Sequence, residues 1–188
     1  MKILVLDNYD SFVYNLVYIL KDLGNEVEVF RNDKIAIEAV QNYDKILLSP
    51  GPGIPEEAGI LIPLIKEYAS TKSIFGVCLG HQAIGEAFGA KLHNMGDVLH
   101  GVTTPCHIID SDEKLFQEIP KTIEVCRYHS WTVVAETMPK ELKITAVDDN
   151  NYVMAQAHTQ YDVRGVQFHP EAYLTQFGVQ ILKNWLKD

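Results

Sequence analysis

The sequence predicts an α/β protein, with an open, mostly parallel sheet flanked by helices and additional antiparallel strands in the second half. In the first half, short apolar runs alternate with amphipathic helical patterns, which is typical of parallel strands covered by helices. After Gly89 the pattern changes to short alternating runs, which indicates antiparallel or mixed pairing. The chain has 188 residues and no linker, repeat or low-complexity stretch, so we expect one domain over residues 1–188.

The elements of the first half follow in order. Residues 3–6 predict a buried strand. Ser11 is expected to cap a helix whose apolar positions recur through Leu23, and Gly24 stands where a C-cap glycine belongs. Further strands are expected at residues 26–30, 45–49 and 73–78, and helices at residues 35–40, 60–69 and 79–88.

The second half has fewer and weaker signals. Residues 123–128 and 143–147 alternate between apolar and polar side chains, which indicates strands with hairpin-like connections. An amphipathic pattern over residues 175–186 predicts a terminal helix.

Charge and cysteine content argue against several classes of protein. Lys and Arg number 16 against 25 Asp and Glu, and the net charge of -9 has the wrong sign for binding nucleic acid or an anionic membrane. Cys78, Cys106 and Cys126 form no C-x-x-C, which favours free thiols in a reducing compartment. No apolar run is long enough for a membrane span or a signal peptide. We therefore expect a cytoplasmic protein whose chain starts directly in its fold.

Cys78 is the candidate nucleophile. It lies in G-V-C-L-G-H-Q, between a predicted strand and a predicted helix. This is the thiol form of a nucleophile elbow, in which Gly76 and Gly80 permit a sharp turn that exposes the central side chain. The positive end of the following helix favours a thiolate at this position. The alternative is a small buried apolar side chain at a strand end, which is the better interpretation of an isolated cysteine.

His169 and Glu171 are the candidate base and its partner. They lie in V-Q-F-H-P-E at the end of a predicted strand. A thiol nucleophile needs a base, and a histidine base needs a group that fixes its tautomer. Pro170 fixes its own φ and favours extended backbone at His169. Taken alone the pattern is weak, and the alternative is a surface histidine beside an unrelated carboxylate.

The loop S-P-G-P-G-I-P at residues 49–55 is a candidate oxyanion hole. It lacks the G-K-[ST] of a phosphate-binding loop and is not G-x-G-x-x-G, so nucleotide binding is disfavoured. Because its prolines carry no N–H, the available donors are Gly51, Gly53 and Ile54, on a stretch stiffened by proline. A rigid turn without a ligand explains the loop alone equally well.

A zinc site is a further interpretation of some of these residues. Cys78 with His81 and Cys126 with His129 form two C-x-x-H pairs. However, Cys126 and His129 fall in an alternating strand pattern, in which residues i and i+3 point to opposite faces, and no two histidines have the spacing of zinc ligands. We therefore expect neither a metal nor a cofactor in this chain.

Together these segments resemble the class I, or triad, glutamine amidotransferases. In that family G-x-C-x-G-H-Q, a Pro/Gly oxyanion loop and H-P-E occur in this order. The resemblance is closest to the glutaminase components of anthranilate synthase and aminodeoxychorismate synthase, and it implies a flavodoxin-like core. The segments that carry it span nearly the whole chain and are residues 6–12, 49–53, 76–84, 100–101, 127–130 and 165–171.

The resemblance implies hydrolysis of L-glutamine to glutamate and ammonia. Cys78 would form a γ-glutamyl thioester, His169 would transfer the proton, and Glu171 would orient His169. The backbone N–H groups of Gly51 and Leu79 would hold the oxyanion. The residues implied in binding glutamine are Gly51, Pro52, Gly53, Gln82, Ser130 and Trp131. Val102, Trp131 and Ala172 depart from the usual Lys, Leu and Ser of the family, and none of the three belongs to the triad.

The implied partner is a chorismate-using synthase subunit. Because one glutaminase domain occupies the whole chain, we expect this partner to be a separate polypeptide. Component I of anthranilate synthase, in tryptophan biosynthesis, is the favoured partner. Aminodeoxychorismate synthase component I, in folate biosynthesis, is the alternative, and one subunit serving both remains open because the glutaminase does not contact chorismate.

Two rivals belong to a different class of function. A flavodoxin-like binding or regulatory domain would share the fold, and so would a catalytically silent relative that only scaffolds its partner. The complete set of Cys78, His169 and Glu171 argues against silence, since loss of one of them would be its simplest sign.

Overall fold

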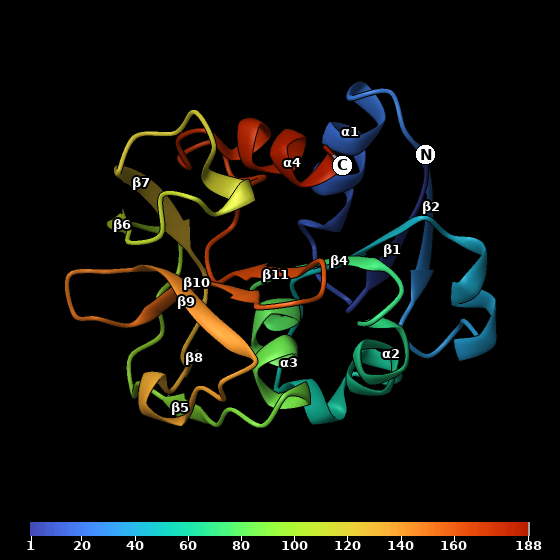
Figure 1. Cartoon of the computed structure of the whole chain (residues 1–188), viewed down its shortest axis with the longest axis horizontal. Coiled ribbons are helices and arrows are strands. Elements are labelled where there is room, and N and C mark those ends of the chain that lie inside the picture. Colours follow the sequence, from blue (N-terminus) through green and yellow to red (C-terminus); the bar gives the residue numbers. More distant parts are fainter. Residues whose placement is uncertain (188) are drawn as a thin grey trace.

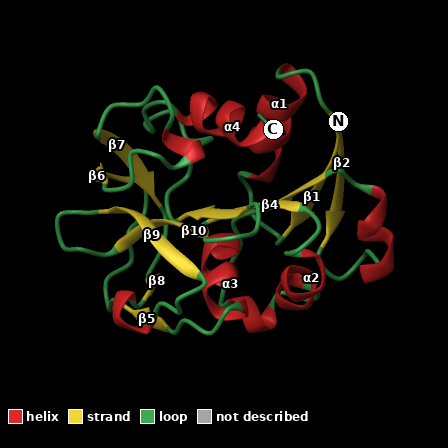
Figure 2. Ribbon diagram, in the orientation of Figure 1, coloured by secondary structure: helices red, strands yellow, loops and turns green. Residues whose placement is uncertain are grey.

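The computed structural model describes residues 1–187, which form a nine-stranded sheet with helices on both faces (Figures 1 and 2). The strand order is β2-β1-β3-β4-β11-β10-β9-β6-β7. The first half of this order is parallel and the second half is antiparallel, so the predicted division of the chain is confirmed.

The parallel half is formed by β1, β2, β3, β4 and β11. Their bounds are Lys2–Asp7, Glu26–Arg31, Lys45–Leu48, Ser73–Val77 and Val163–Val166. β11 comes from the end of the chain and pairs with β4, so the last parallel strand lies directly beside the strand that precedes Cys78. Every residue of β3 is buried, as expected for a central strand covered on both faces.

The helices cover the two faces of this parallel half in pairs. They are α1 (Val13–Asp22), α2 (Leu61–Tyr68), α3 (Leu79–Ala87) and α4 (Gly178–Leu186). α1 and α4 lie on one face and α2 and α3 on the other (Figure 1). Alternate residues of β1 follow this division, since Ile3 packs with the α1 and α4 side and Leu4 with the α2 side. In residues 1–187, no helix has the length and apolar content needed to cross a membrane.

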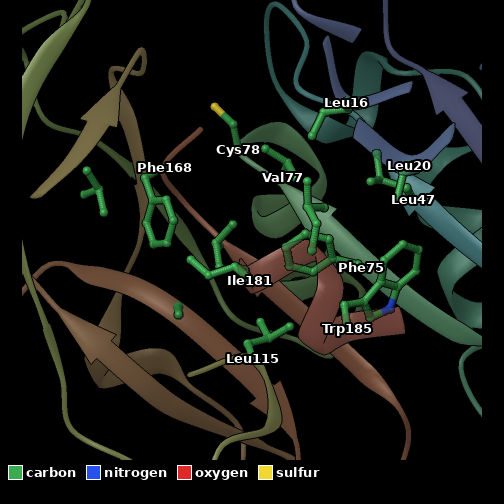
Figure 3. Close-up of a cluster of buried hydrophobic side chains, with 14 of the residues drawn as sticks. Leu16, Leu20, Leu47, Phe75, Val77, Cys78, Leu115, Phe168, Ile181 and Trp185 are labelled. Atoms are coloured by element: carbon green, nitrogen blue, oxygen red, sulfur yellow. The ribbon is translucent and has the colours of Figure 1, made fainter. Parts of the chain in front are cut away.

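Two of the clusters of buried apolar side chains are large. The cluster under α1 and α4 includes Leu16, Phe75 and Trp185, and the rings of Phe75 and Trp185 lie 5.5 Å apart (Figure 3). Burial of such aromatic side chains stabilises a fold by roughly 1.5–3 kcal/mol each relative to exposure. The parallel half is therefore a rigid base for the loops at its edge.

The antiparallel half is formed by β10, β9, β6 and β7. Their bounds are Val153–His158, Leu142–Val147, Val102–Ile108 and Thr122–Arg127. A separate two-stranded sheet joins β5 (Leu92–Asn94) to β8 (Trp131–Val133). The sequence predicts β7 and β9 but not β5, β6, β8 or β10. All six residues of β10 are buried, so its sequence lacks the alternation that marks a half-exposed strand.

Two predictions about helix α1 have different outcomes. Ser11 does not cap it, because the helix begins after Phe12 and the Asp10 carboxylate accepts the Phe12 N–H at 2.8 Å. Gly24 is confirmed as the C-cap glycine, with φ +85°. The N–H groups of Gly24 and Asn25 bond to the carbonyls of Lys21 and Leu20, which is a Schellman motif.

Two other helix predictions are corrected. The helix expected at residues 35–40 is a 3₁₀ segment at Ile37–Asn42, because a run this short does not repay the nucleation of an α-helix. The terminal helix begins at Gly178 rather than at residue 175, because Phe177 has a left-handed φ of 58°. Further 3₁₀ segments occur at Pro55–Glu57, Lys114–Phe116 and Ala135–Thr137.

Candidate active site

The candidate residues meet at the carboxyl ends of the parallel strands. Residues 49–53 follow β3, Cys78 follows β4, and residues 167–171 follow β11. Open α/β sheets bind their ligands at this edge, where the loops after neighbouring strands converge. A cavity of about 170 Å³ lies there, and its lining residues are Gly51, Pro52, Gly53, Cys78, Gln82, Val98, Tyr128, His129, Ser130 and Trp131. A larger cavity, of about 370 Å³ beside β8, contains none of the candidate triad.

Cys78 occupies the sharp turn between β4 and α3. Its backbone has φ 53° and ψ -102°, a conformation that residues other than glycine rarely adopt. Its N–H donates to Val166 O at 2.9 Å and its carbonyl accepts the Gln82 N–H at 3.0 Å. The sulfur points away from the apolar side chains around it (Figure 3). The strained turn is therefore held from both sides while the thiol reaches the cavity.

The two glycines around Cys78 have a different role from the one expected. The positive φ belongs to Cys78 itself and not to Gly76 or Gly80. A Cβ at Gly76 would lie 2.5 Å from the carbonyl of Gly80, and a Cβ at Gly80 would lie 2.5 Å from the carbonyl of Leu48. These glycines let helix α3 pack directly against the strands, which brings its N-terminus to the thiol.

His169 and Glu171 form a buried pair. His169 Nδ1 lies 2.7 Å from Glu171 Oε1, and both side chains are at most 2% exposed. The imidazole packs edge-on against the rings of Phe12 and Tyr128, with centroids 5.7 and 5.0 Å away. The His169 carbonyl accepts a hydrogen bond from Thr175 Oγ1 at 2.6 Å. The ring is therefore fixed in position and in tautomer, with Nδ1 toward the carboxylate.

The electrostatics of His169 follow from this position. Burial by itself lowers the pKa of the imidazole, but interactions with the Cys78 thiol and the Glu171 carboxylate outweigh it and raise the pKa to about 10. Because Nδ1 is bonded to Glu171, Nε2 is the nitrogen left to interact with Cys78, and it makes no hydrogen bond to any described group. The arrangement favours an imidazolium beside the sulfur.

The Pro/Gly loop is pinned to the end of β1. Asn8 donates from its backbone N–H to Ser49 Oγ and from Nδ2 to Ser49 O, both at 2.8 Å. Asn32 Nδ2 donates in turn to Asn8 Oδ1 at 3.0 Å. A Cβ at Gly51 would lie 2.5 Å from the carbonyl of Asn8 and 2.8 Å from Leu79 Cδ2. Only glycine at position 51 allows this loop to lie so close to Leu79, the first residue of α3.

The opposite wall of the cavity is the segment between β7 and β8. The carbonyl of Trp131 accepts from Gln82 Nε2 at 2.9 Å and lies 2.7 Å from His129 Nδ1. Arg127 Nε donates to His129 Nε2 at 3.0 Å, and its Nη1 pairs with Asp148 Oδ2 at 2.7 Å. Burial and then the charge of Arg127 lower the pKa of His129 to about 4, so its ring is neutral.

The histidines of the two C-x-x-H pairs, His81 and His129, serve packing and this wall of the cavity. His81 is fully buried, burial lowers its pKa to about 3, and its ring lies against Gly165 of β11. His129 bonds to Arg127 and Trp131. Within residues 1–187, no three His, Cys, Asp or Glu side chains are grouped so that they would hold a metal ion.

Sequence reasoning missed four residues that shape the site, namely Asn8, Phe12, Tyr128 and Gln167. Each lies within a segment quoted for the family resemblance, and that was the signal available. Their contacts join segments far apart in the chain, such as Phe12 with His169, and no local pattern predicts such contacts.

Comparisons with known proteins identify the family. The family described as "Glutamine amidotransferase class-I" matches residues 4–188, and the chain belongs to it. It is therefore a glutamine amidotransferase. "Anthranilate synthase component 2" of Thermus thermophilus is 46% identical, with 100% of this chain and 93% of the relative covered. The protein of the same description from Mycobacterium tuberculosis is 45% identical, with 99% and 82% covered.

Two further relatives differ in their described function. "Aminodeoxychorismate/anthranilate synthase component 2" of Bacillus subtilis is 42% identical, with 98% of this chain and 95% of the relative covered. The crystal structure of a protein from Thermoplasma acidophilum, described as part of a "putative gmp synthase", superposes with a TM-score of 0.88 at 26% identity, with 98% of this chain and 92% of that chain covered. The fold is thus shared more widely than the described function.

Proposed function

We propose that this chain is a glutaminase subunit that hydrolyses L-glutamine and passes ammonia to a separate chorismate-using synthase subunit. Anthranilate synthase, in tryptophan biosynthesis, is the favoured complex, because two of the relatives above are described as its component 2. The observation that carries the chemistry is the interaction of the Cys78 thiol with the imidazole of His169, whose Nδ1 lies 2.7 Å from Glu171 Oε1.

The proposed first half-reaction forms a thioester. With the pKa of His169 raised to about 10, Cys78 reacts as a thiolate beside an imidazolium. The sulfur attacks the side-chain amide carbon of glutamine, and the carbonyl π electrons move to oxygen. The imidazolium then donates its Nε2 proton to the departing nitrogen, the C–N bond breaks, and ammonia leaves a γ-glutamyl thioester.

The second half-reaction returns the enzyme to its starting state. Neutral His169 removes a proton from water, the hydroxide attacks the thioester carbon, and the C–S bond breaks to release glutamate and the thiolate. In both halves we assign the oxyanion to the backbone N–H groups of Gly51 and Leu79, which the close packing of the loop on α3 supports. Glu171 keeps the ring oriented and balances its charge.

Glutamine is proposed to bind in the cavity beside Cys78, along Gly51, Pro52, Gly53, Gln82, Ser130 and Trp131, all of which line it. Nucleophile, base and oxyanion donors are all side-chain or backbone groups of this chain, so the proposed reaction requires no cofactor in this subunit. We place the protein in the cytoplasm, which its three free cysteines support.

A second product is favoured by a specific observation. The Bacillus subtilis relative is described as a component of both aminodeoxychorismate and anthranilate synthase. We therefore retain aminodeoxychorismate synthesis, in folate biosynthesis, as the alternative, together with one subunit serving both synthases. Capture of the synthase partner from the native organism, followed by its identification, distinguishes these cases.

The proposal is tested with the assembled complex and the Cys78→Ser variant. We expect synthesis from glutamine to be lost while synthesis from added ammonia survives, because only ammonia production needs the thiol. The Cys106→Ser variant is a matched control, since Cys106 is buried in β6 and does not line the cavity. Glutamine-dependent synthesis by Cys78→Ser at the wild-type rate would overturn the proposal.

A further inference from the structure

Gln167 lies between the two halves of the site and has no role in the mechanism above. It follows β11 directly and is fully buried. Its backbone N–H donates to Met154 O at 2.9 Å, which keeps it in register with β10. Its side-chain Nε2 lies 3.6 Å from the Cys78 sulfur, and its Oε1 accepts from Gln82 Nε2 at 3.2 Å. The amide therefore links the thiol to a residue of the cavity wall.

The order of donors and acceptors along this link has one solution. The carbonyl of Trp131 is always an acceptor, so Gln82 must present its Nε2 to it. The same Nε2 also contacts the side chain of Gln167, so Gln167 must accept this hydrogen bond with its Oε1. The opposite end of the Gln167 amide, an N–H, is left facing the Cys78 sulfur. Reversing either amide would place donor against donor or acceptor against acceptor.

The same carbonyl is held in place from its other side. His129 donates its Nδ1 proton to Trp131 O, and its Nε2 accepts from Arg127 Nε. Arg127 is anchored by the buried Asp148 carboxylate. A chain of hydrogen bonds thus runs from the buried Arg127–Asp148 pair to the sulfur of Cys78. The ion pair fixes the Trp131 carbonyl, and this carbonyl sets the orientation of the two glutamine amides.

We infer that Gln167 is a positioning residue that donates an N–H to the Cys78 sulfur and holds Gln82 with its Oε1 toward the cavity. An N–H aimed at sulfur favours the thiolate over the thiol. This inference deepens the proposed function and rests on Cys78 as the nucleophile.

A consequence concerns the substrate. Both contacts of Gln82 described above use Nε2, which has two N–H groups, so its Oε1 is the atom left for the cavity that Gln82 lines. An acceptor here takes an N–H donor of glutamine, either its ammonium or its carboxamide. Without Gln167, Gln82 Nε2 would lose one acceptor and with it the constraint on its orientation.

The test measures alkylation of Cys78 by iodoacetamide across pH, without glutamine or partner, with the modified residue located by peptide mass mapping. Gln167→Glu replaces the donor with a carboxylate of nearly the same shape. We expect its pH midpoint of alkylation to rise by about one unit or more, which is roughly a tenfold lower rate at fixed pH below the midpoint. Gln167→Met removes the donor without adding charge, and we expect a smaller rise in the same direction.

Gln156→Met is the matched control. Gln156 is also a fully buried glutamine whose Nε2 donates to a carbonyl, that of His81, but it does not contact Cys78. We expect this variant to lose stability without moving the midpoint. An unchanged midpoint in Gln167→Met, or an equal rise in Gln156→Met, would overturn the inference. If the buried charge prevents Gln167→Glu from folding, Gln167→Met still decides the question.

The result is independent of the proposed function, because alkylation needs no turnover. If Gln167→Met shifts the midpoint but Cys78→Ser leaves glutamine use intact, the proposed function fails and the contact stands. If the midpoint does not move while Cys78→Ser abolishes glutamine use, only the role of Gln167 is wrong. In the assembled complex, we also expect the KM for glutamine to rise in Gln167→Met, because Gln82 loses its fixed orientation.

Discussion

The backbone of Cys78 shows how one residue is strained for its task. A φ of 53° at a residue with a Cβ costs roughly 1–2 kcal/mol, and it persists here because Val166 and Gln82 bond to the turn from both sides. The turn directs the thiol away from the apolar core (Figure 3), where it interacts with the buried imidazole of His169. The fold therefore gives up stability at this position and in return presents the thiol that we propose as the nucleophile.

This strain predicts an inverted preference between glycine and alanine. At position 78 we expect Cys78→Gly to have a free energy of unfolding about 1 kcal/mol higher than Cys78→Ala, because glycine tolerates the left-handed φ. At Ala83, inside α3, the order should be the usual one, with Ala83→Gly about 1 kcal/mol less stable than wild type. Urea unfolding of the three variants and wild type measures both differences. Greater stability of Cys78→Ala than of Cys78→Gly would contradict the strained turn.

At the scale of single residues, the sequence points to the candidate triad but not to the residues that support it. Cys78, His169 and Glu171 stand in short patterns whose chemistry can be argued from their neighbours in the chain. Asn8, Phe12 and Gln167 support them through contacts between different strands and loops. The positive φ of Cys78 is also invisible in the sequence, where the flanking glycines draw attention instead.

The segment between β7 and β8 shows how elements form a wall of the site. It is held by the Arg127–Asp148 pair, with side chains 3% and 2% exposed, and by the hydrogen bonds from Arg127 through His129 to the carbonyl of Trp131. Asp148 Oδ1 also accepts the backbone N–H groups of Asn150 and Tyr152, so the turn after β9 depends on the same carboxylate. Removing one member of a buried pair leaves the other charge uncompensated.

Two neighbouring aspartates allow a matched test. We expect Asp148→Asn to lower the free energy of unfolding by about 3 kcal/mol and to raise the KM for glutamine, because Arg127 loses its anchor. Asp149→Asn should stay close to wild type in both, since the Asp149 side chain is 66% exposed and, among the described residues, pairs only with His107 at the surface. Urea unfolding and glutaminase assays of the complex measure these effects. Equal losses in the two variants would refute a special role for the buried pair.

Element boundaries were predicted unevenly for physical reasons. The parallel strands are buried on both faces and their helices on one face. Each kind of burial leaves an apolar pattern that can be recognised within a short stretch of sequence. The start of α4 depends on Thr175, whose hydroxyl bonds to the carbonyl of His169 and accepts the Cys126 N–H instead of capping a helix. β10 is buried along its whole length, so it lacks the alternation by which a half-exposed strand is recognised.

At the scale of the whole molecule, strand order brings the site together. The order β2-β1-β3-β4-β11 places residues from positions 8 to 171 at one edge, and β11 is the strand that carries the H-P-E segment to Cys78. The same fold buries two histidines in neutral form, since burial lowers the pKa of His81 to about 3 and of His129 to about 4. Unfolding at acidic pH lets both take up protons.

The sign of the resulting pH dependence is definite. Unfolded histidine has a pKa of about 6.5, so below that pH the unfolded chain binds protons that the folded chain excludes. Stability falls as pH decreases from about 6.5 toward 4, with a slope that approaches 1.4 kcal/mol per pH unit for each histidine. We expect His129→Gln to make this slope shallower by about 1.4 kcal/mol per pH unit, the contribution of one proton, when urea unfolding is measured at several pH values. His93 is exposed, and we expect His93→Gln to leave the slope unchanged. Equal slopes in wild type and His129→Gln would show that His129 is not buried neutral.

The most direct test of the central claim is to trap the γ-glutamyl thioester on Cys78. The assembled complex is mixed with isotopically labelled L-glutamine, quenched in acid during turnover, and digested for peptide mass analysis. We predict that the peptide containing Cys78 carries a labelled glutamyl group, which is absent from Cys78→Ser and increases when His169→Gln slows hydrolysis of the thioester more than its formation. Turnover of glutamine by the complex with no label on Cys78 at any quench time, or label on another residue, would contradict the account.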